Sequence, residues 1–472
     1  MSVAANRAPF KVALIGAGDR GSIYARFIRK NPGRFILTAV AEPDPRKARD
    51  IAVRFGLPTN AVFADWSALL DAQLEGRLEA DAVIVATMDR QHYEPASRAI
   101  AQGLHALLEK PVATTPEETA RLAAQARAAG LTLTVCHVLR YTRLFRAVKK
   151  LVDDGAVGLP VSILHAENVA WYHMAHSYVR GNWGSSVESS PMILAKCSHD
   201  LDLIAWFAGS RPEALSSVGG SIAFRPENAP AGAPERCSLG CPAAKECPYE
   251  AEACYLRGRP IKAALAANGA PLTALAARAL MPVWKEWPTS TITRDLSAEG
   301  IRRALAEGPF GRCVYRCGGD QPDHQDTVIS FASGLSATLR LHGMSSKEGR
   351  TIRIDGTEGT LRATFGGRSE IELWPHGAIR PRRYRFPSSP LGHSEGDEGV
   401  MMEFHARLSE AAEATREGLA RGDAGPPSDS WLADSGLTSH LMAFAAHRSR
   451  LSGASVPWSS WDRLLQDSGL GS

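Results

Sequence analysis

The glycine turn near the start of the chain constrains the fold more than any other feature. Residues 10–15 form a short apolar run, and Gly16, Gly18 and Gly21 follow it in the spacing G-x-G-x-x-G. Residues 22–30 then carry apolar side chains at helical spacing. Glycines at these positions let a backbone approach a pyrophosphate, and the next helix supplies N–H groups and the positive end of its dipole. Strand, turn and helix together predict a dinucleotide-binding unit, whereas a lone glycine motif could be an ordinary turn.

An acidic residue follows at the distance that such a unit requires. The next strand is expected over residues 35–42, and it ends at Glu42, which follows Gly18 by 24 residues. A carboxylate there accepts hydrogen bonds from both ribose hydroxyls of NAD and repels the 2′-phosphate of NADP. The sequence therefore predicts NAD as the cofactor and makes NADP less favourable, although Arg46 is close enough to weaken the preference.

Apolar strands and amphipathic helices alternate regularly after this unit. Strands are expected at 81–87, 105–111 and 131–138, and helices at 91–103 and 115–130. This rhythm predicts an α/β fold with a doubly wound parallel sheet through about residue 140.

Residues 86–118 resemble the Gfo/Idh/MocA oxidoreductases, the group that includes glucose-fructose oxidoreductase and inositol dehydrogenase. The resemblance rests on the tripeptide Glu109-Lys110-Pro111, which matches the E-K-P signature of the family after the fifth strand. It resumes over residues 137–158, 198–209 and 352–361.

The resemblance implies two domains. An NAD(P)-binding Rossmann domain would occupy residues 1–140, and a C-terminal α/β substrate and oligomerisation domain would occupy residues 141–472. The second domain would carry a large open, mainly antiparallel sheet, with the substrate between that sheet and the nicotinamide. Members of the family act mostly on sugars and cyclitols. On the same ground we expect a homo-oligomer, a dimer or tetramer joined through the C-terminal sheet.

The expected cofactor site combines the glycine turn with residues that follow the parallel strands. Ligands of open α/β sheets bind at the carboxyl ends of the strands, which is where these residues fall. The residues expected at the cofactor are Gly16, Gly18, Asp19, Arg20, Gly21, Glu42, Thr87, His92, Glu109 and Lys110. For His92, a structural place at a helix N-terminus is an equal alternative.

The expected catalytic residues depart from the family pattern. Members usually carry D-x-G-x-H-x-x-D; here His199 and Asp202 match the His and the last Asp, but Ala195 replaces the first Asp and Lys196 stands beside it. An ammonium group at the site can bond a sugar hydroxyl and stabilise the alkoxide that forms before hydride loss. The predicted catalytic residues are Lys110, His199 and Lys196.

A stretch just before this motif is rich in His, Arg and aromatic side chains. Aromatic faces stack on sugar C–H groups, and Arg and His bond hydroxyls. A structured loop whose aromatic rings fill the core is an equal alternative. The residues expected at the substrate are His173, His176, Arg180, Trp183, Asp202 and His324.

These features lead to one main hypothesis and two alternatives. The main hypothesis is an NAD-dependent oxidoreductase that oxidises a hydroxyl of a sugar or glycoside, with C3 as a candidate carbon. The first alternative is a redox-cycling, NAD-dependent glycosidase, in which a ketone at C3 makes the C2 proton acidic and the aglycone is eliminated. The second is a non-catalytic NAD sensor or scaffold.

A thiol cluster lies at about 225–325, in what looks like an insertion into the C-terminal domain. A structural zinc site takes four thiolates at about 2.3 Å from the metal. The predicted ligands are Cys237, Cys241, Cys247 and Cys317, with Cys313 and Cys254 in reserve. An iron–sulfur cluster also takes four thiolates and is the alternative metal. The third possibility is unligated cysteines or a disulfide between Cys313 and Cys317.

Composition excludes other classes of partner. The 472 residues carry a formal net charge of +4 without a basic stripe, which argues against nucleic acid. No uncharged apolar run of membrane-spanning length occurs, and the N-terminus has no apolar signal region. These observations predict a cytoplasmic protein in a reducing compartment, where clustered cysteines favour metal ligands or redox thiols over structural disulfides.

Overall fold

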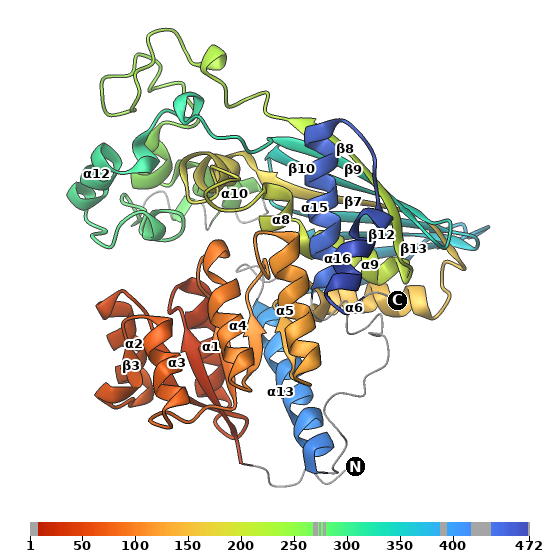
Figure 1. The fold of residues 1–472 in the computed structure, drawn as a ribbon. Helices are drawn as coiled ribbons and strands as arrows, with labels where there is room; N and C mark the ends of the chain where they lie inside the picture. The colour runs from red at the N-terminus through yellow and green to blue at the C-terminus, as the bar shows by residue number, and fades with distance from the viewer. Residues whose placement is uncertain are drawn as a thin grey trace.

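The computed structural model describes residues 8–267, 272, 275–276, 280–387, 394–416 and 436–470. It has two sheets, one in each lobe (Figure 1). The first sheet has six strands in the order β3-β2-β1-β4-β5-β6, and every pairing in it is parallel. This is the doubly wound arrangement that the alternating pattern predicts, so that prediction is confirmed. Its strands are β1 (Phe10–Ile15), β2 (Phe35–Ala41), β3 (Val62–Phe63), β4 (Ala82–Val85), β5 (His105–Leu108) and β6 (Leu133–Val135).

Helices cover both faces of the parallel sheet. Because its central strands are buried on both faces, they read as continuous apolar runs such as Ala82–Val85. The helices are α1 (Asp19–Lys30), α2 (Pro45–Phe55), α3 (Trp66–Leu74), α4 (Tyr93–Ala101) and α5 (Pro116–Ala128). Asp44, Asp65 and Thr115 cap α2, α3 and α5 by accepting a hydrogen bond from a first-turn N–H group.

The second sheet has nine strands in the order β14-β13-β12-β11-β7-β10-β9-β8-β15. The pairings are antiparallel except between β7 and β10, so the predicted mainly antiparallel sheet is also confirmed. Its strands are β7 (Pro160–Ala170), β8 (Pro212–Gly220), β9 (His324–Phe331), β10 (Ser336–Ser345), β11 (Gly349–Gly356), β12 (Gly359–Gly366), β13 (Ser369–Pro375), β14 (Arg382–Phe386) and β15 (Val456–Pro457).

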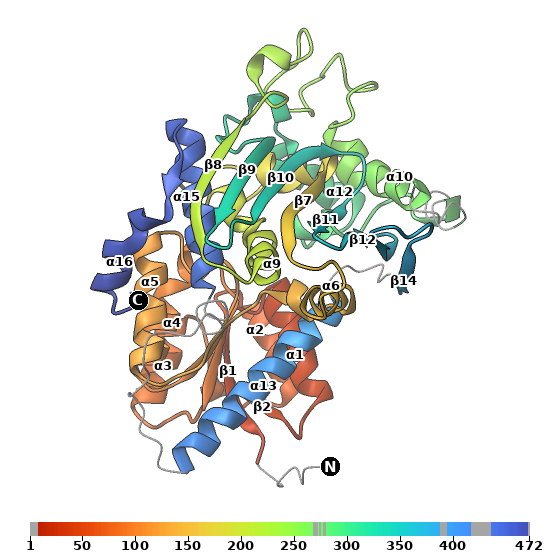
Figure 2. The same ribbon diagram turned by 90° about the vertical axis from the view of Figure 1, so that its right-hand side faces the viewer.

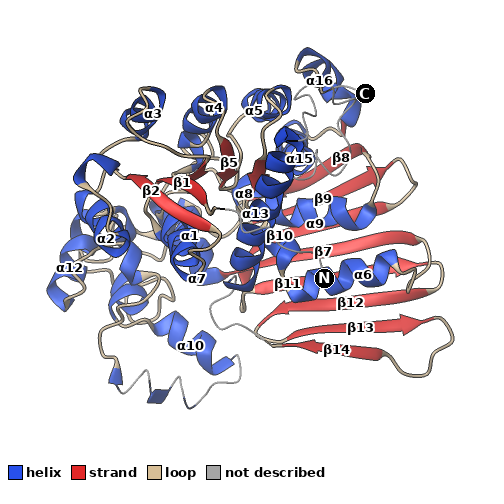
Figure 3. Cartoon of the chain, turned by 90° about the horizontal axis from the view of Figure 1, so that it is seen from below, coloured by secondary structure: helices blue, strands red, loops and turns tan. Residues whose placement is uncertain are grey.

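One face of the nine-stranded sheet carries helices and forms the larger core. Figure 3 shows α6 (Arg143–Asp153), α9 (Ser198–Ala208) and α15 (Leu437–Ser452) lying across it. Leu201, Ile329 and Leu339 belong to the core between these layers. The opposite face presents Leu164 and Val328, which are about half exposed. The remaining helices of this part are the short α7 (Trp171–His173) and α8 (Met192–Ala195), the π-helical segment Met174–Arg180, and α16 (Asp462–Asp467).

The chain returns to the first lobe after the second sheet is complete. Helix α13 (Ser394–Arg416) lies beside α1 (Figure 2). Its Phe404 ring stacks on Phe35 of β2, with 6.3 Å between ring centroids, and Val400 and Met401 are buried in the same core. A division of the chain at residue 140 therefore misses one helix that the nucleotide-binding lobe needs.

The segment between β8 and β9, which includes the residues predicted to form an insertion at about 225–325, forms a small layer of its own. It contains α10 (Arg259–Ala267) and α12 (Ala298–Glu307). Its own core consists of Ala251, Cys254, Tyr255, Leu256, Ile301 and Leu305. Among the residues that the structure describes, no helix has the length and apolar composition needed to cross a membrane.

A buried histidine joins the last long helix to the nucleotide-binding lobe. His440 of α15 is fully buried; its Nε2 accepts a hydrogen bond from the Val112 N–H at 2.9 Å, and its Nδ1 lies 2.6 Å from the Gly436 carbonyl. Burial and the neighbouring His137 lower the pKa of His440 to about 3. The folded protein therefore keeps this imidazole neutral at a pH where an unfolded chain protonates it.

We predict that this residue makes stability fall with pH below about 6.5, the pKa of an unfolded histidine. The unfolded state gains a proton there and the folded state does not, so stability is lost as pH falls and is restored above that value. In His440→Gln, the stability gap to the wild type should narrow by about 2 kcal/mol between about pH 7 and about pH 5. Urea unfolding at each pH measures the free energy of unfolding of both proteins, and the exposed His376→Gln is the control. A difference between variant and wild type that does not change with pH would contradict the assignment.

Candidate active site

A cleft of about 830 Å³ lies between the two lobes, at the carboxyl ends of the parallel strands. The glycine turn after β1, Thr87 after β4 and Glu109 after β5 line one side. Trp183, Lys196 and His199 line it from the C-terminal lobe. The cleft thus brings the predicted cofactor residues, except Gly21, and the three predicted catalytic residues into one space.

The glycine turn has the geometry that a pyrophosphate requires. Gly16 has φ +92°, and a Cβ on it would lie 2.5 Å from the Ala86 carbonyl oxygen. A Cβ on Gly21 would lie 2.0 Å from the Gly16 carbonyl oxygen, so this glycine lets α1 pack close to the turn. Nothing lies within 4 Å of the corresponding position on Gly18, which leaves open space at the N-terminus of α1. These residues fit a dinucleotide phosphate.

Glu42 is held at the base of this turn. It is 7% exposed; Oε2 accepts the Ala17 N–H at 2.7 Å and Oε1 accepts the Asp44 N–H at 3.0 Å. The carboxylate lines the cleft in the place where a ribose would lie in a unit of this type. Its remaining lone pairs can accept hydrogen bonds from ribose hydroxyls.

Arg20 and Glu109 bind each other across the cleft floor. Arg20 Nε lies 2.5 Å from Glu109 Oε1, and its Nη2 lies 2.7 Å from Asp397 Oδ1 on α13. The Tyr24 hydroxyl also donates to Glu109, at 2.5 Å. Burial opposes the charge on Glu109, but Arg20, Tyr24 and Lys110 together outweigh it and lower the pKa of the carboxyl. This network fixes the strand end that carries Lys110.

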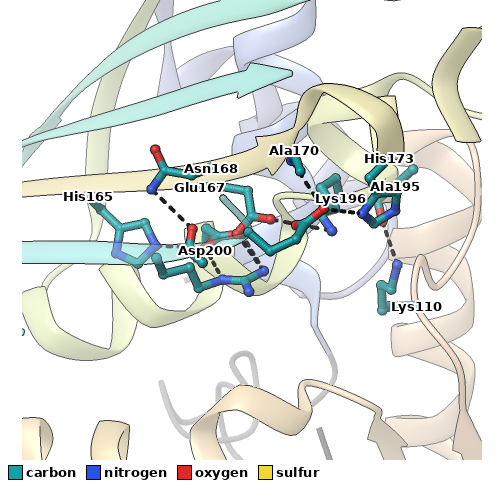
Figure 4. Close-up of polar contacts among 12 residues, drawn as sticks. Lys110, His165, Glu167, Asn168, Ala170, His173, Ala195, Lys196 and Asp200 are labelled. Carbon is teal, nitrogen blue, oxygen red and sulfur yellow. Dashed lines mark hydrogen bonds and ion pairs between the residues drawn. The ribbon is translucent and has the colours of Figure 1, made fainter. Parts of the chain in front are cut away.

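Lys110 points across the cleft to the C-terminal lobe. Its Nζ donates to the Ala195 carbonyl at 2.5 Å, next to Lys196 (Figure 4). Burial lowers the pKa of Lys110, although Asp89 and Glu109 oppose the shift. The ammonium group therefore lies where the two lobes meet. It is held by the carbonyl of Ala195, the residue that stands in place of the first Asp of the family motif.

Lys196 is the end of a buried chain of charges. Its Nζ lies 3.4 Å from Glu167 Oε1, and Glu167 Oε2 lies 2.8 Å from an Nη of Arg350. Arg350 in turn donates from Nε to Asp200 Oδ1 at 2.7 Å, and the same oxygen lies 2.7 Å from His165 Nε2. Figure 4 shows Lys196, Glu167, Asp200 and His165 of this chain in one row of polar contacts. Burial disfavours the charge on Lys196, but Glu167 and Glu348 outweigh it and raise the pKa.

His199 reaches the same part of the cleft from the first turn of α9. Its ring contacts His137 edge to face, with 5.6 Å between centroids, and His137 contacts His440 in the same way at 5.7 Å. Burial lowers the pKa of His137, so the ring behind His199 stays neutral.

His92 has a structural place beside its position in the cleft. Nδ1 lies 2.6 Å from the Pro111 carbonyl and Nε2 lies 3.1 Å from the Thr87 carbonyl. Both ring nitrogens are thus directed at the backbone. The residue ties the loop after β4 to the loop after β5, which agrees with the structural alternative.

The predicted substrate residues separate into one at the cleft and five elsewhere. Trp183 lines the cleft, where its Nε1 donates to Asp89 Oδ2 at 3.1 Å. Asp202 does not line it, because both carboxylate oxygens accept hydrogen bonds from Arg140, at 2.5 and 2.7 Å. His324 pairs with the neighbouring Asp323 at the start of β9. Asp202 and His324 therefore stabilise the structure around them and do not contribute to the walls of the cleft.

The other three face the insertion or the sheet. His173 Nδ1 lies 2.7 Å from Glu348 Oε1. His176 stacks on Phe310, with 4.9 Å between centroids, and Arg180 is buried against Tyr249 and the thiol segment. This is the alternative in which the aromatic loop fills a core.

The structure adds residues that the sequence did not reveal. Arg350 lines the cleft, and Asp89, 6% exposed, accepts from Trp183 and from the Ser190 hydroxyl. Glu167 supports Lys196 from β7. One feature of the sequence could have identified Glu167 and Arg350. Each is a charged residue at a position where the alternation of its strand calls for a buried side chain.

The cysteine prediction needs a correction. Cys237, Cys241 and Cys247 line one small cavity, but the fourth thiol on its wall is that of Cys313, not Cys317. All the cysteines are free, so the alternative of a Cys313–Cys317 disulfide is wrong. Within the described residues, no three His, Cys, Asp or Glu side chains are placed to hold one metal ion, so the predicted zinc tetrahedron is not formed.

Comparison with known proteins assigns the nucleotide-binding lobe. Residues 10–137 match the Gfo/Idh/MocA model, described as an oxidoreductase family with an NAD-binding Rossmann fold, which confirms the resemblance over the nucleotide-binding part of the chain.

Curated relatives match less than half of the chain. A 2,7-anhydro-N-acetylneuraminate hydratase of Mediterraneibacter gnavus is 28% identical over 215 residues, which are 46% of this chain and 54% of that protein. An inositol 2-dehydrogenase of Ralstonia nicotianae is 28% identical over 200 residues, 42% of this chain and 54% of that protein. The chain thus spans about half the length of these relatives.

A solved structure covers nearly all of the chain. It is an inositol dehydrogenase homologue of Azotobacter vinelandii complexed with NADH and myo-inositol, with a TM-score of 0.61 and 16% identity over 96% of this chain and 98% of that one. At this identity the likeness shows a shared fold.

We predict that Glu42→Ala weakens NAD binding by about 1–3 kcal/mol, the scale of lost hydrogen bonds to a buried carboxylate. Glu42→Gln should lose less, because one acceptor oxygen remains to hold the Ala17 N–H. Calorimetric titration with NAD and NADP measures both, and the exposed Glu75→Ala serves as control. Equal or tighter binding of NADP by the wild type would contradict the role of Glu42.

Proposed function

We propose that this chain, whose nucleotide-binding domain is that of the Gfo/Idh/MocA oxidoreductases, oxidises a hydroxyl group of a sugar or glycoside with NAD as the hydride acceptor. The observation that carries the proposal is the single cleft. Its walls include the glycine turn and Glu42 and also Lys110, Lys196 and His199. A dinucleotide held by the glycine turn and Glu42 would supply a hydride acceptor in the same cleft as these three side chains.

The three candidate catalytic residues take different roles. Lys196 stays protonated, since Glu167 raises its pKa, and it therefore suits the stabilisation of a developing alkoxide rather than proton removal. His199 is the proton acceptor in this proposal, because its imidazole lines the same cleft and imidazole is the most common general base of enzymes. Lys110 bonds the substrate oxygen and is held in place by the Ala195 carbonyl. When bound, NAD accepts the hydride.

A polyhydroxylated substrate suits the walls of the cleft. Trp183 offers an aromatic surface, and Asp89 beside it offers a carboxylate to hydroxyl groups. Relatives named for inositol oxidation and for an anhydro sugar derivative are consistent with this class. The individual sugar and the carbon atom oxidised are left to experiment.

A redox-neutral reaction is the second candidate. It is favoured by the relatives named as hydratases, a name that describes addition of water rather than net oxidation. The same residues could serve it, because a ketone formed beside an acidic C–H bond permits elimination of a neighbouring group. Accumulation of NADH during turnover distinguishes net oxidation from this cycle.

We predict that Lys110→Ala abolishes most turnover while NAD binding is kept, and that His199→Ala lowers turnover by about 10²–10⁴-fold. The substrate comes from a panel of sugars, cyclitols and glycosides, with keto products detected by mass and NADH by absorbance. Lys150→Ala on the exposed side of α6 is the matched control.

Two results would change this assignment. If His199→Ala keeps nearly full activity while Lys196→Ala is inactive, the role of proton acceptor belongs to Lys196. A protein that binds NAD but exchanges no hydride with any member of the panel would favour an NAD sensor or scaffold over an enzyme.

We also propose that the uncovered face of the nine-stranded sheet pairs with a second copy of the chain. Neighbouring strands place Val328, Thr338 and Leu164 in one row, and Arg353 and Arg362 continue it. An apolar half beside a charged half is the composition of an interface core with its rim.

We predict that Leu164→Glu on this face reduces the particle mass measured by light scattering to about half or less. Leu74→Glu, at an exposed position of α3, should leave the mass unchanged. A monomeric wild type would contradict the pairing.

A further inference from the structure

Asp89 is a buried carboxylate of the cleft, and one of its oxygens is not used by the chain. It follows β4, lines the cleft and is 6% exposed. Oδ2 accepts two hydrogen bonds, from Trp183 Nε1 at 3.1 Å and from the Ser190 hydroxyl at 2.5 Å. Among the residues that the structure describes, none donates to Oδ1. Buried carboxylate oxygens normally have a donor, so Oδ1 is available to a ligand that enters the cleft.

The segment that binds Oδ2 is itself held in place. Ser190 is fully buried, and its carbonyl accepts a hydrogen bond from Gln321 Nε2 at 2.9 Å. Gln321 Oε1 accepts the Met192 N–H at 2.8 Å, and Arg90 of the other lobe donates to the Val187 carbonyl. The carboxylate of Asp89 therefore has a fixed orientation, as a group that recognises a ligand requires.

Asp89 lies at the same sheet edge as Lys110. Strands β4 and β5 are parallel neighbours, and Val85 at the end of one is paired with Leu108 at the end of the other. Asp89 follows Val85 by four residues, and Lys110 follows Leu108 by two. Both side chains therefore reach the cleft from adjacent strand ends, where ligands of open α/β sheets bind.

The charge on Asp89 acts on Lys110. Burial lowers the pKa of Lys110, and the neighbouring cations Lys196 and Arg20 lower it further. Asp89 and Glu109 raise this pKa, and Asp89 has the larger effect. The carboxylate of Asp89 is thus the main negative charge that favours the protonated form of Lys110.

The other groups near Lys110 do not replace this charge. Glu109 is already bound by Arg20 and by the Tyr24 hydroxyl. The nearby imidazole of His440 is neutral, since burial lowers its pKa to about 3. Lys110 Nζ itself has the uncharged Ala195 carbonyl as its hydrogen-bond partner.

We propose that Asp89 is the carboxylate of this active site, with Oδ1 accepting a hydroxyl group of the substrate while its charge holds the proton on Lys110. The part that concerns the substrate rests on the proposed function. In this arrangement the nucleotide-binding lobe supplies a carboxylate where Ala195 of the C-terminal lobe offers only its backbone. The substrate class narrows accordingly to compounds with a second free hydroxyl near the one that is oxidised.

Titration of Lys110 tests the charge, and it needs neither NAD nor a sugar. The full chain carries ¹³C-labelled lysine, and the NMR signal of Lys110 is identified by its absence in Lys110→Arg. In Asp89→Asn an amide oxygen can still accept from Trp183 and Ser190, but the charge is lost. Lys110 should therefore release its proton at a lower pH than in the wild type.

Two further variants show whether charge is the cause. Asp50→Asn, at an exposed position of α2, should leave the titration of Lys110 unchanged. Ser190→Ala removes one hydrogen bond to Asp89 and keeps the charge, so it should also leave the titration unchanged. The charge role is overturned if Lys110 titrates alike in Asp89→Asn and the wild type, or if Ser190→Ala shifts it as much as Asp89→Asn does.

The hydroxyl contact is tested with the sugar or cyclitol that the substrate panel identifies and with analogues that each lack one other hydroxyl. For one analogue, kcat/KM of the wild type should fall by about tenfold or more, the scale of a lost hydrogen bond to a charged acceptor. Asp89→Ala should use that analogue and the parent compound about equally well. If Asp89→Ala discriminates against every analogue as strongly as the wild type does, Asp89 does not bind the hydroxyl.

Failure of this inference is distinguishable from failure of the proposed function. A chain that oxidises no member of the panel overturns the proposed function and the hydroxyl contact together, while the titration of Lys110 still decides the charge role. A chain that oxidises a sugar but shows neither effect of Asp89 keeps the proposed function and overturns this inference alone.

Discussion

The buried Arg350 is the interaction on which the C-terminal lobe depends. Its guanidinium binds Glu167 on β7 and Asp200 on α9, and it comes itself from β11. It therefore fastens the helix layer to the sheet at the point where the sheet reaches the cleft. Removal of one partner would leave an uncompensated buried charge, which costs far more than a lost surface ion pair. The second oxygen of Glu167 holds Lys196, so the same interaction that stabilises the lobe also positions a candidate catalytic cation.

Features that depend on neighbours in sequence could be predicted, and features that depend on register between distant strands could not. The glycine turn, Glu42 and Lys110 are all placed by a strand and the residues next to it, and the structure brings all three to the cleft. The link between Glu167 and Arg350 joins residues 183 positions apart through the pairing of β7 with β11. No local pattern determines that pairing, so the sequence could mark each residue as a charge at a buried strand position but could not join the two.

In the segment before α9, the sequence predicted substrate residues that the structure places elsewhere. His, Arg and aromatic side chains gather there in the composition of a sugar site, but His176 and Arg180 pack into the insertion instead. Their direction depends on whether another layer covers the segment, which composition does not encode. The cysteines behave similarly: spacing identified the two thiol segments, whereas the choice between Cys313 and Cys317 depends on the bridge between residues 236 and 312.

The insertion also touches the nucleotide-binding lobe through an ion pair that differs from the buried pairs described above. Arg294, just before α12, pairs with Asp44, two residues after Glu42. Two parts of the chain that are far apart in sequence are thus joined two residues from a carboxylate that lines the cleft. Both side chains of this pair are partly exposed, whereas the pair between Arg350 and Glu167 is buried. Salt weakens exposed ion pairs, so a rise in ionic strength loosens the insertion from the nucleotide-binding lobe before it affects the interior of the C-terminal lobe.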